Sequence, residues 1–155
     1  MPFVDVLICG REDAAKLFGI GEPSAASGND TPDPAAYAAA AEQLVAQFGF
    51  QSVAFTLRET ISASDTVWSG LLHSGGKTYI ARDYRIHLVD RVGGGDSFTA
   101  GLIYGMLQGY DPQHTLDFAT AASCLKQTIE QDFNLSFVDE IEMVASGEAT
   151  GRIRR

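Results

Sequence analysis

The stretch Asp90-Arg-Val-Gly-Gly-Gly-Asp-Ser-Phe-Thr-Ala-Gly101 decides how this sequence folds and where its chemistry lies. Apolar residues from Tyr84 to Val89 precede it and predict a strand, and the residues after the glycines predict a helix to about Leu107. Glycines at a strand-to-helix turn expose backbone N–H groups, and the helix dipole favours an anion there. The stretch therefore predicts a phosphate-binding turn, with Asp96 as a charged carboxylate at the helix start. A plain helix N-terminus after a flexible loop explains the same residues, and both interpretations remain open.

Two other nucleotide-binding motifs do not fit the spacing. In the dinucleotide fingerprint G-x-G-x-x-G, the third glycine would fall on Phe98. The sequence Gly76-Lys77-Thr78 resembles the end of a Walker A loop, but Leu71 stands where that motif requires glycine. Apolar residues on both sides instead predict a hairpin that turns at Gly75-Gly76, with Lys77 on the surface.

The rest of the chain alternates strand and helix patterns. The predicted strands are 3–8, 51–57, 67–73, 77–81 and 84–89, with a polar segment at 58–65. The predicted helices are 11–18, 34–48, one that follows the glycines at 93–95 and runs to about 107, 111–128 and 136–145. Asp33 and Gly49 are the expected caps of the second helix, and Ser136 is the expected N-cap of the last. Glycines 101, 105 and 109 form a small-residue stripe that predicts close helix packing. The alternation predicts one α/β domain, 1–155, with a mostly parallel sheet flanked by helices.

Composition narrows the function classes. The 11 basic and 20 acidic residues give a formal net charge of −9, which disfavours nucleic acid and anionic membranes as partners. The sequence has no apolar run near the ~20 residues that span a bilayer, nor a signal-peptide pattern, so a cytoplasmic location is the default expectation. Cys9 and Cys124 have no metal-site or disulfide spacing and predict buried small residues. Three histidines without paired spacing predict structural or surface roles.

The segment 90–101 resembles the second signature of the ribokinase-like (PfkB-type) carbohydrate kinases, Asp-x-x-Gly-Ala/Gly-Gly-Asp-x-Phe followed by a helix. Three further segments are similar to the 2-keto-3-deoxygluconate kinase branch: Ala54-Phe-Thr-Leu-Arg58, Val89-Asp-Arg-Val92 and Thr128-Ile-x-x-Asp-Phe-Asn-Leu135. The likeness extends from about Val4 to the C-terminus. It implies the C-terminal, nucleotide-binding half of a ribokinase-like fold.

The resemblance implies specific roles for residues of this sequence. Asp96 would be the catalytic base, and the amides of Gly93, Gly94 and Gly95 would form the anion hole for the transferred phosphoryl group. The other implied positions are Thr56, Leu57 and Arg58 at the nucleotide, Asp90 and Val92 at a K⁺ site, and Asp132 at the substrate. For Arg58 a solvated loop arginine, and for Asp132 an ordinary loop or cap aspartate, are the alternatives. The implied cofactors are ATP and Mg²⁺, and the implied substrate is a small sugar acid.

Two departures from the family pattern affect these expectations. The family's Asn-x-x-Glu/Asp motif, tied to magnesium, reads Gly10-Arg-Glu-Asp13 here, so Glu12 and Asp13 are either metal residues or simply favourable at a helix N-terminus. Family members are also roughly twice as long, and the sugar-binding and lid half has no counterpart in this sequence. We expect a truncated gene product or a fragment of a longer one, whose exposed sheet edge favours a homo-oligomer. The competing hypotheses are an ATP-dependent sugar kinase, an inactive nucleotide-binding module, and a remnant that folds poorly.

Overall fold

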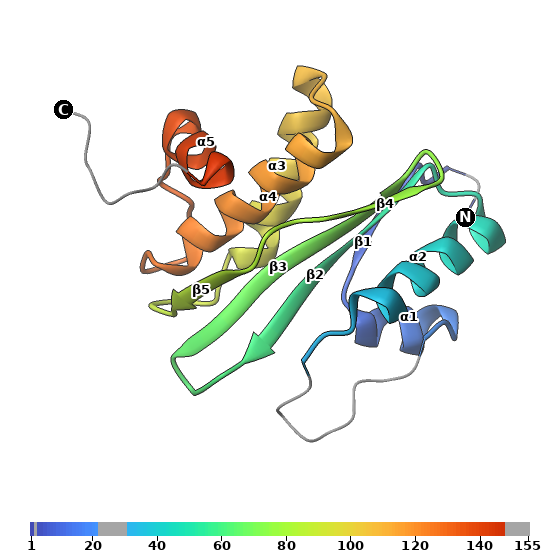
Figure 1. Ribbon diagram of the computed structural model, residues 1–155, viewed down its shortest axis with the longest axis horizontal. Helices are drawn as coiled ribbons and strands as arrows, with labels where there is room; N and C mark the ends of the chain where they lie inside the picture. The colour runs from blue at the N-terminus through green and yellow to red at the C-terminus, as the bar shows by residue number, and fades with distance from the viewer. Residues whose placement is uncertain (2, 22–30, 148–155) are drawn as a thin grey trace. The chain divides into compact units, whose positions relative to one another are not determined.

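The computed structural model describes residues 1, 3–21 and 31–147, and its chain divides into two compact units, Met1–His87 and Leu88–Arg155 (Figure 1). The first unit holds all five described strands and two helices. The second unit holds the other three described helices. The α/β class expected from the sequence is confirmed, and the extent of a single domain over 1–155 stays a prediction.

The first unit is built on one mixed sheet. Its strands are β1 (Val6–Cys9), β2 (Ser52–Thr60), β3 (Asp65–Ser74), β4 (Lys77–Ile80) and β5 (Tyr84–His87), in the order β1-β2-β3-β4 with β5 paired to β3. Only β1 and β2 pair in parallel among these described strands. The expectation of a mostly parallel sheet is therefore wrong here. The reason is connection length, because the β2–β3 and β3–β4 turns are too short for the crossover that a parallel pairing needs.

Two helices join β1 to β2 and cover one face of the sheet. They are α1 (Arg11–Phe18) and α2 (Pro34–Phe48), and Figure 1 shows both on the same side of the strands. Leu44 of α2 packs in one core with Phe55 and Leu57 of β2 and Leu71 of β3. Alternate residues of a strand face opposite sides of a sheet, so the even-numbered residues of β2 and β3 lie on the other face.

Local capping signals place α2 where the sequence predicts it. The Asp33 side chain accepts a hydrogen bond from the Ala35 amide at 3.0 Å, and Gly49 ends the helix in the left-handed conformation. Strand β2, by contrast, is longer than expected. Arg58 to Thr60 belong to the strand rather than to a polar loop, because they pair with Trp68 to Thr66 on β3.

The second unit is a three-helix arrangement. It consists of α3 (Gly94–Gln108), α4 (Pro112–Gln127) and α5 (Val138–Ser146). A Cβ at Gly101 would lie 2.6 Å from the Ala119 Cα, and one at Gly105 would lie 2.9 Å from the Thr115 Cγ2, so both glycines allow α3 and α4 to pack closely. Gly109 is not part of this contact; it ends α3 with φ +72°.

The start of α5 differs from the sequence prediction. Its N-cap is Phe137 rather than Ser136, and the Glu140 carboxylate accepts the Phe137 amide at 2.7 Å. Ser136 is used elsewhere, since its own amide donates to the Asn134 side chain at 2.9 Å. The helix therefore begins one residue later than the hydroxyl suggests.

One carboxylate connects α5 to α4. Glu142 accepts hydrogen bonds from the Tyr110 hydroxyl at 2.9 Å and lies 2.9 Å from the His114 Nε2, while the rings of Tyr110 and His114 stack with centroids 4.0 Å apart. The bond to Glu142 raises the pKa of Tyr110 to about 12, because the phenolate would lie against a carboxylate. This cluster accounts for His114 as a structural residue.

Candidate functional site

The glycine turn lies at the N-terminus of α3, as the sequence predicts. Gly93 is the N-cap in the left-handed conformation, with φ +78°. Its carbonyl accepts the Ser97 amide at 2.9 Å, and the Gly94 amide donates to the Arg91 carbonyl at 3.2 Å. The amides of Gly95 and Asp96 donate to no other described residue, and both residues are exposed. Two N–H groups and the positive end of the α3 dipole thus remain available to an anion.

Asp90 accepts hydrogen bonds from two backbone amides next to this turn. One of its carboxylate oxygens accepts the Val92 amide at 3.0 Å, and the other accepts the Gln131 amide at 3.1 Å. Gln131 has φ +67° and is the only described non-glycine residue with positive φ. Asp90 therefore ties the turn before α3 to the loop after α4, across 41 residues of sequence.

The same loop packs directly against the first glycine. A Cβ at Gly93 would lie 2.9 Å from the Asp132 carbonyl carbon and 3.1 Å from its Cα, and it would overlap the Asp132 carbonyl oxygen. Only glycine fits here, for its φ and for this contact. Asp132 is thus brought to the glycine turn by its backbone, and its own side chain is exposed.

Two side chains of α4 support Gly94 from beneath. Ser123 donates its hydroxyl to the Gly94 carbonyl at 2.8 Å, and a Cβ at Gly94 would lie 3.1 Å from the Gln127 Cγ. The Gln127 carbonyl also accepts the amides of Val89 and Asp90 at 2.9 and 3.3 Å. Sequence reasoning missed Ser123 and Gln127, because neither belongs to a motif. Their support fixes the direction of the first turn of α3.

Three predicted nucleotide residues lie together on β2 of the first unit. Thr56 is half-buried, Leu57 is buried in the core beneath α2, and Arg58 is exposed. The Leu57 side chain is therefore committed to packing, which leaves its backbone groups for any ligand contact. Thr56 and Arg58 point to the opposite face of the sheet.

The predicted metal residues stabilise the start of α1. Asp13 accepts the Gly10 amide at 3.2 Å, and Glu12 forms an ion pair with Lys16 at 2.9 Å. The hydrogen bond and charge of Lys16 lower the pKa of Glu12. Both acidic residues thus act as favourable groups at a helix N-terminus. Among the described residues, no group of three or more His, Cys, Asp or Glu side chains could hold a metal ion.

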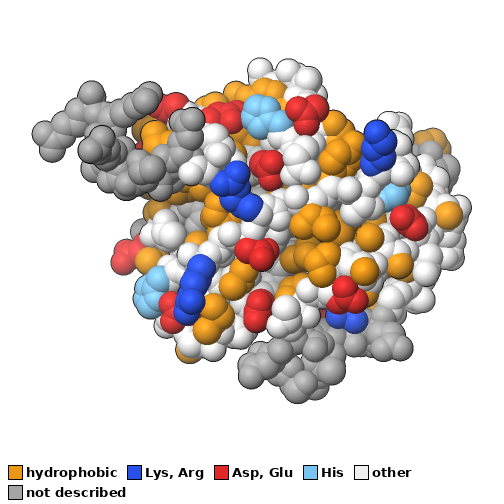
Figure 2. Space-filling model, viewed as in Figure 1, with side chains coloured by type: hydrophobic (Ala, Val, Ile, Leu, Met, Phe, Trp, Pro, Cys, Tyr) orange, Lys and Arg blue, Asp and Glu red, His pale blue; other side chains and the backbone are white. Residues whose placement is uncertain are grey.

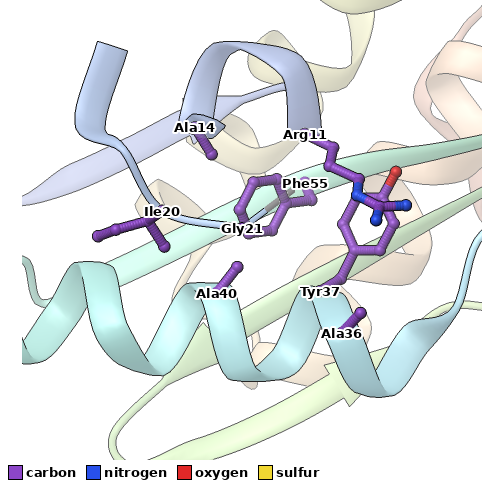
Figure 3. A pocket seen from close by; sticks show the side chains of 8 residues that line it. All are labelled: Arg11, Ala14, Ile20, Gly21, Ala36, Tyr37, Ala40 and Phe55. Carbon is purple, nitrogen blue, oxygen red and sulfur yellow. The ribbon is translucent and has the colours of Figure 1, made fainter. Parts of the chain in front are cut away.

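A small cavity lies between α1, α2 and β2 (Figure 3). Its volume is about 30 Å³, and its wall includes Ala14, Ala40 and Phe55, with the Arg11 guanidinium 5.7 Å from the centre of the Tyr37 ring. A second hollow, of about 90 Å³, is lined by residues that include Leu57, Glu59 and Ser69. Both are far below the ~300 Å³ of a typical ligand site, so neither holds a nucleotide by itself.

Acidic side chains outnumber basic ones on the surface drawn in Figure 2, as the excess of Asp and Glu over Lys and Arg in the sequence predicts. On the face drawn in Figure 2, Lys and Arg side chains are scattered singly among more numerous Asp and Glu side chains. No helix in the described part of the chain is long and apolar enough to cross a membrane.

The glycine turn can therefore bind an anion and present a carboxylate beside it. The family model described as pfkB family carbohydrate kinase matches residues 1–131, which include this turn. The chain belongs to the pfkB carbohydrate kinase family. The matched range includes the Asp90-to-Gly101 segment, which resembles the family's second signature.

Solved structures support the same assignment. The structure of 2-dehydro-3-deoxygluconokinase from Thermotoga maritima is 45% identical with a TM-score of 0.85, over 94% of this chain and 43% of that one. A PfkB family carbohydrate kinase from Listeria grayi is 31% identical with a TM-score of 0.77, over 94% of this chain and 42% of that one. The ribokinase-like class, nearest to the deoxygluconate kinase branch, is confirmed.

A curated relative matches the chain over a similar share of its own length. The 2-dehydro-3-deoxygalactonokinase of Haloferax volcanii is 25% identical over 150 residues, which are 97% of this chain and 41% of the relative. The chain thus spans about two fifths of the length of each of these three relatives.

Proposed function

We propose that this chain binds ATP and carries the catalytic carboxylate of a sugar-acid kinase, with 2-keto-3-deoxygluconate as the substrate and its 6-phosphate as the product. The observation that carries the proposal is the turn at Gly93–Asp96. In its first turn of α3, two amides that bond to no other described residue lie beside the carboxylate of Asp96, an exposed residue. Similarity to a 2-dehydro-3-deoxygluconokinase at 45% identity supports the choice of sugar.

The proposed step is an in-line transfer. Asp96 accepts the proton of the sugar hydroxyl, whose oxygen forms a bond to the γ-phosphorus as the bond from that phosphorus to the bridging oxygen of ADP breaks. The amides of Gly93, Gly94 and Gly95 stabilise the charge on the transferred group, although the Gly94 amide must first leave the Arg91 carbonyl. Positioning and charge stabilisation supply most of the rate in such a transfer, so a weak carboxylate base suffices.

The residues present suit the proposed ions unequally. Mg²⁺ binds mainly through nucleotide phosphates and water, with at most one or two carboxylates, and Asp13 or Glu12 would supply these. Glu12 is already paired with Lys16, so Asp13 is the better candidate of the two. For K⁺, Asp90 and the Val92 carbonyl are the proposed ligands, because the Asp90 oxygens keep lone pairs beyond the two amides that they accept. A cytoplasmic location is part of the same proposal.

A second candidate is a nucleotide-binding module without turnover. One observation favours it: Gly10 provides no side chain where the family pattern has asparagine. In that case the glycine turn retains ATP while the sugar is not phosphorylated.

One experiment separates these candidates. Purified chain is assayed for ADP release with Mg-ATP and 2-keto-3-deoxygluconate, and its melting temperature is measured with and without Mg-ATP. A kinase shows sugar-dependent release that Asp96→Asn lowers about 100- to 10,000-fold, whereas Asp139→Asn, at another helix N-terminus, leaves it unchanged. A module shows only nucleotide stabilisation, about 2.7 kcal/mol at one hundred times Kd. If the chain shows neither sugar-dependent ADP release nor stabilisation by Mg-ATP, both candidates are refuted.

A further inference from the structure

The hydroxyl of Ser123 makes a hydrogen bond that leaves its own helix. A serine or threonine inside a helix can donate to the carbonyl of a residue one turn earlier. Thr120 does this on α4, where its hydroxyl donates to the Leu116 carbonyl at 2.8 Å. Ser123 instead donates to the Gly94 carbonyl of α3, also at 2.8 Å, and the residue is 0% exposed. The bond therefore joins α4 to the first turn of α3.

The Gly94 carbonyl and the Gly95 N–H belong to one peptide unit. A peptide unit is planar and trans, so its C=O and N–H groups point in opposite directions. By holding the carbonyl, Ser123 therefore also sets the direction of the Gly95 N–H. That N–H is one of the two at the start of α3 that donate to no other described residue. Ser123 thus acts on an anion-binding amide without being part of the glycine turn.

The Gly94 amide, which belongs to the preceding peptide unit, is in a different state. It donates to the Arg91 carbonyl at 3.2 Å, so an anion must displace that bond before it can use this amide. The Gly95 amide needs no such exchange. Of these two neighbouring donors, Gly95 is therefore the one that is ready to bind an anion.

The first turn of α3 needs support because its first two residues are glycines, Gly94 and Gly95. Glycine loses more backbone freedom than any other residue when it is ordered, and helix ends fray. A hydrogen bond from a buried side chain of another helix opposes that fraying. It holds the turn in its helical geometry in the absence of a ligand.

Gln127 in turn orients the serine. Its Nε2 lies 3.3 Å from the Ser123 carbonyl oxygen and 3.5 Å from the Ser123 Oγ, and both residues are buried. A hydroxyl oxygen can accept one hydrogen bond while its proton is donated in another. A donor beside the Oγ therefore leaves the hydroxyl proton free to point at the Gly94 carbonyl.

We infer that Ser123 is a positioning residue of the anion site, which directs the Gly95 N–H at the phosphate group before the nucleotide binds. The inference rests on the proposed nucleotide binding and adds a residue that the glycine motif does not include. Donors that are already in place stabilise charge without a cost of reorganisation. Loss of the Ser123 hydroxyl should therefore weaken phosphate binding, although the hydroxyl itself is bonded to the protein backbone.

Ser123→Ala removes the hydroxyl and leaves the glycine turn unchanged in sequence. Calorimetric titration with Mg-ATP and with Mg-tripolyphosphate should show affinity weakened about 2- to 10-fold, the equivalent of one hydrogen bond. The loss should be the same for both ligands, because the Gly95 amide is proposed to contact phosphate alone. Unchanged affinity for both ligands overturns this inference and leaves the proposed function standing.

Thr120→Val is the matched control. It removes a hydroxyl that is also 0% exposed, lies on the same helix and makes a bond of the same length, but whose acceptor is on α4. Both variants should lower the melting temperature by similar amounts, whereas only Ser123→Ala should weaken phosphate binding. Equal weakening in the two variants would mean that affinity follows stability, which overturns the positioning role.

Residual dipolar couplings test the same inference in the wild-type chain, because they report the direction of each N–H bond. Relative to the other N–H bonds of α3, the coupling of Gly95 should stay the same when Mg-tripolyphosphate is added. In Ser123→Ala the ligand-free coupling should be reduced and the ligand should restore it. A Gly95 N–H that turns on ligand binding in the wild type contradicts the inference. No binding of either ligand to the wild-type chain overturns both this inference and the proposed function.

Discussion

The backbone carbonyl of Asp132 occupies the space where a side chain at Gly93 would begin. Position 93 also has φ +78°, which residues with a Cβ rarely adopt. The glycine that opens α3 is therefore required twice, once by its own conformation and once by a loop that lies 39 residues later in the sequence.

Replacement of Gly93 by alanine should lower the free energy of unfolding by about 2–5 kcal/mol, through backbone strain and the collision with Asp132. Gly95→Ala is the matched control, because a Cβ at Gly95 meets nothing within 4 Å and alanine favours a helix. Urea unfolding of the two variants makes the comparison. Equal losses of stability would contradict the account of Gly93.

Asp90→Asn should loosen the loop after α4. The amide group can accept at only one of the two positions now occupied by the Val92 and Gln131 amides, so about 1–3 kcal/mol of stability is lost. Hydrogen exchange at the Gln131 amide should accelerate more than exchange within β3. Asp83→Asn, at an exposed carboxylate with no described hydrogen bond, is expected to alter neither quantity.

Both thiols should resist alkylation near neutral pH. Burial, with the charge of Asp13 as a second cause, raises the pKa of Cys9 from near 9 to about 12, and burial raises the pKa of Cys124 as well. Iodoacetamide rates on the folded chain should keep rising above pH 9, whereas the urea-unfolded chain reaches a plateau. Asp13→Asn should accelerate reaction at Cys9 but not at Cys124.

The same shifts set a pH dependence of stability. A thiol whose pKa is raised in the folded state contributes stability that is fully present below its unfolded pKa and is lost as the pH rises towards the folded value. The free energy of unfolding should therefore fall above about pH 9, and a Cys9→Ala, Cys124→Ala variant should fall less steeply. A parallel decline in both proteins would exclude the thiols as the cause.

Glu142→Gln should return the pKa of Tyr110 from about 12 towards 10, since the carboxylate that opposes the phenolate is gone. The chain has five tyrosines, so about one fifth of the phenolate absorbance should move to lower pH. Tyr110→Phe identifies that fraction by removing it. A titration curve identical to that of the wild type would show that Glu142 does not raise the pKa of Tyr110.

Local signals in the sequence predict some elements well. Asp33-Pro34 and Gly49 define both ends of α2, because an N-cap side chain and a left-handed glycine act within one turn. Gly75-Gly76 likewise predicts the β3–β4 hairpin, with Lys77 exposed in β4. The glycine turn before α3 belongs to the same group.

Non-local contacts explain what the sequence does not predict. Arg58 to Thr60 are polar, and only their pairing with β3 makes them a strand. Nothing in the sequence around Asp90 predicts its hydrogen bond with Gln131, which lies 41 residues away. Ser123 and Gln127, which support Gly94, belong to no motif. Residues that meet only in three dimensions leave no periodic pattern along the chain.

The close contact of α3 with α4 constrains how this part of the protein can change over time. A Cβ at Gly101 would lie 2.6 Å from the Cα of Ala119, a backbone atom that no substitution removes. At Gly105 the nearest atom is the Cγ2 of Thr115, which a smaller residue would lack. A larger residue at position 105 can thus be compensated by a smaller residue at position 115 of α4. No substitution on α4 makes the same room for a side chain at position 101. Among diverging descendants of this chain, positions 105 and 115 should co-vary and position 101 should stay glycine.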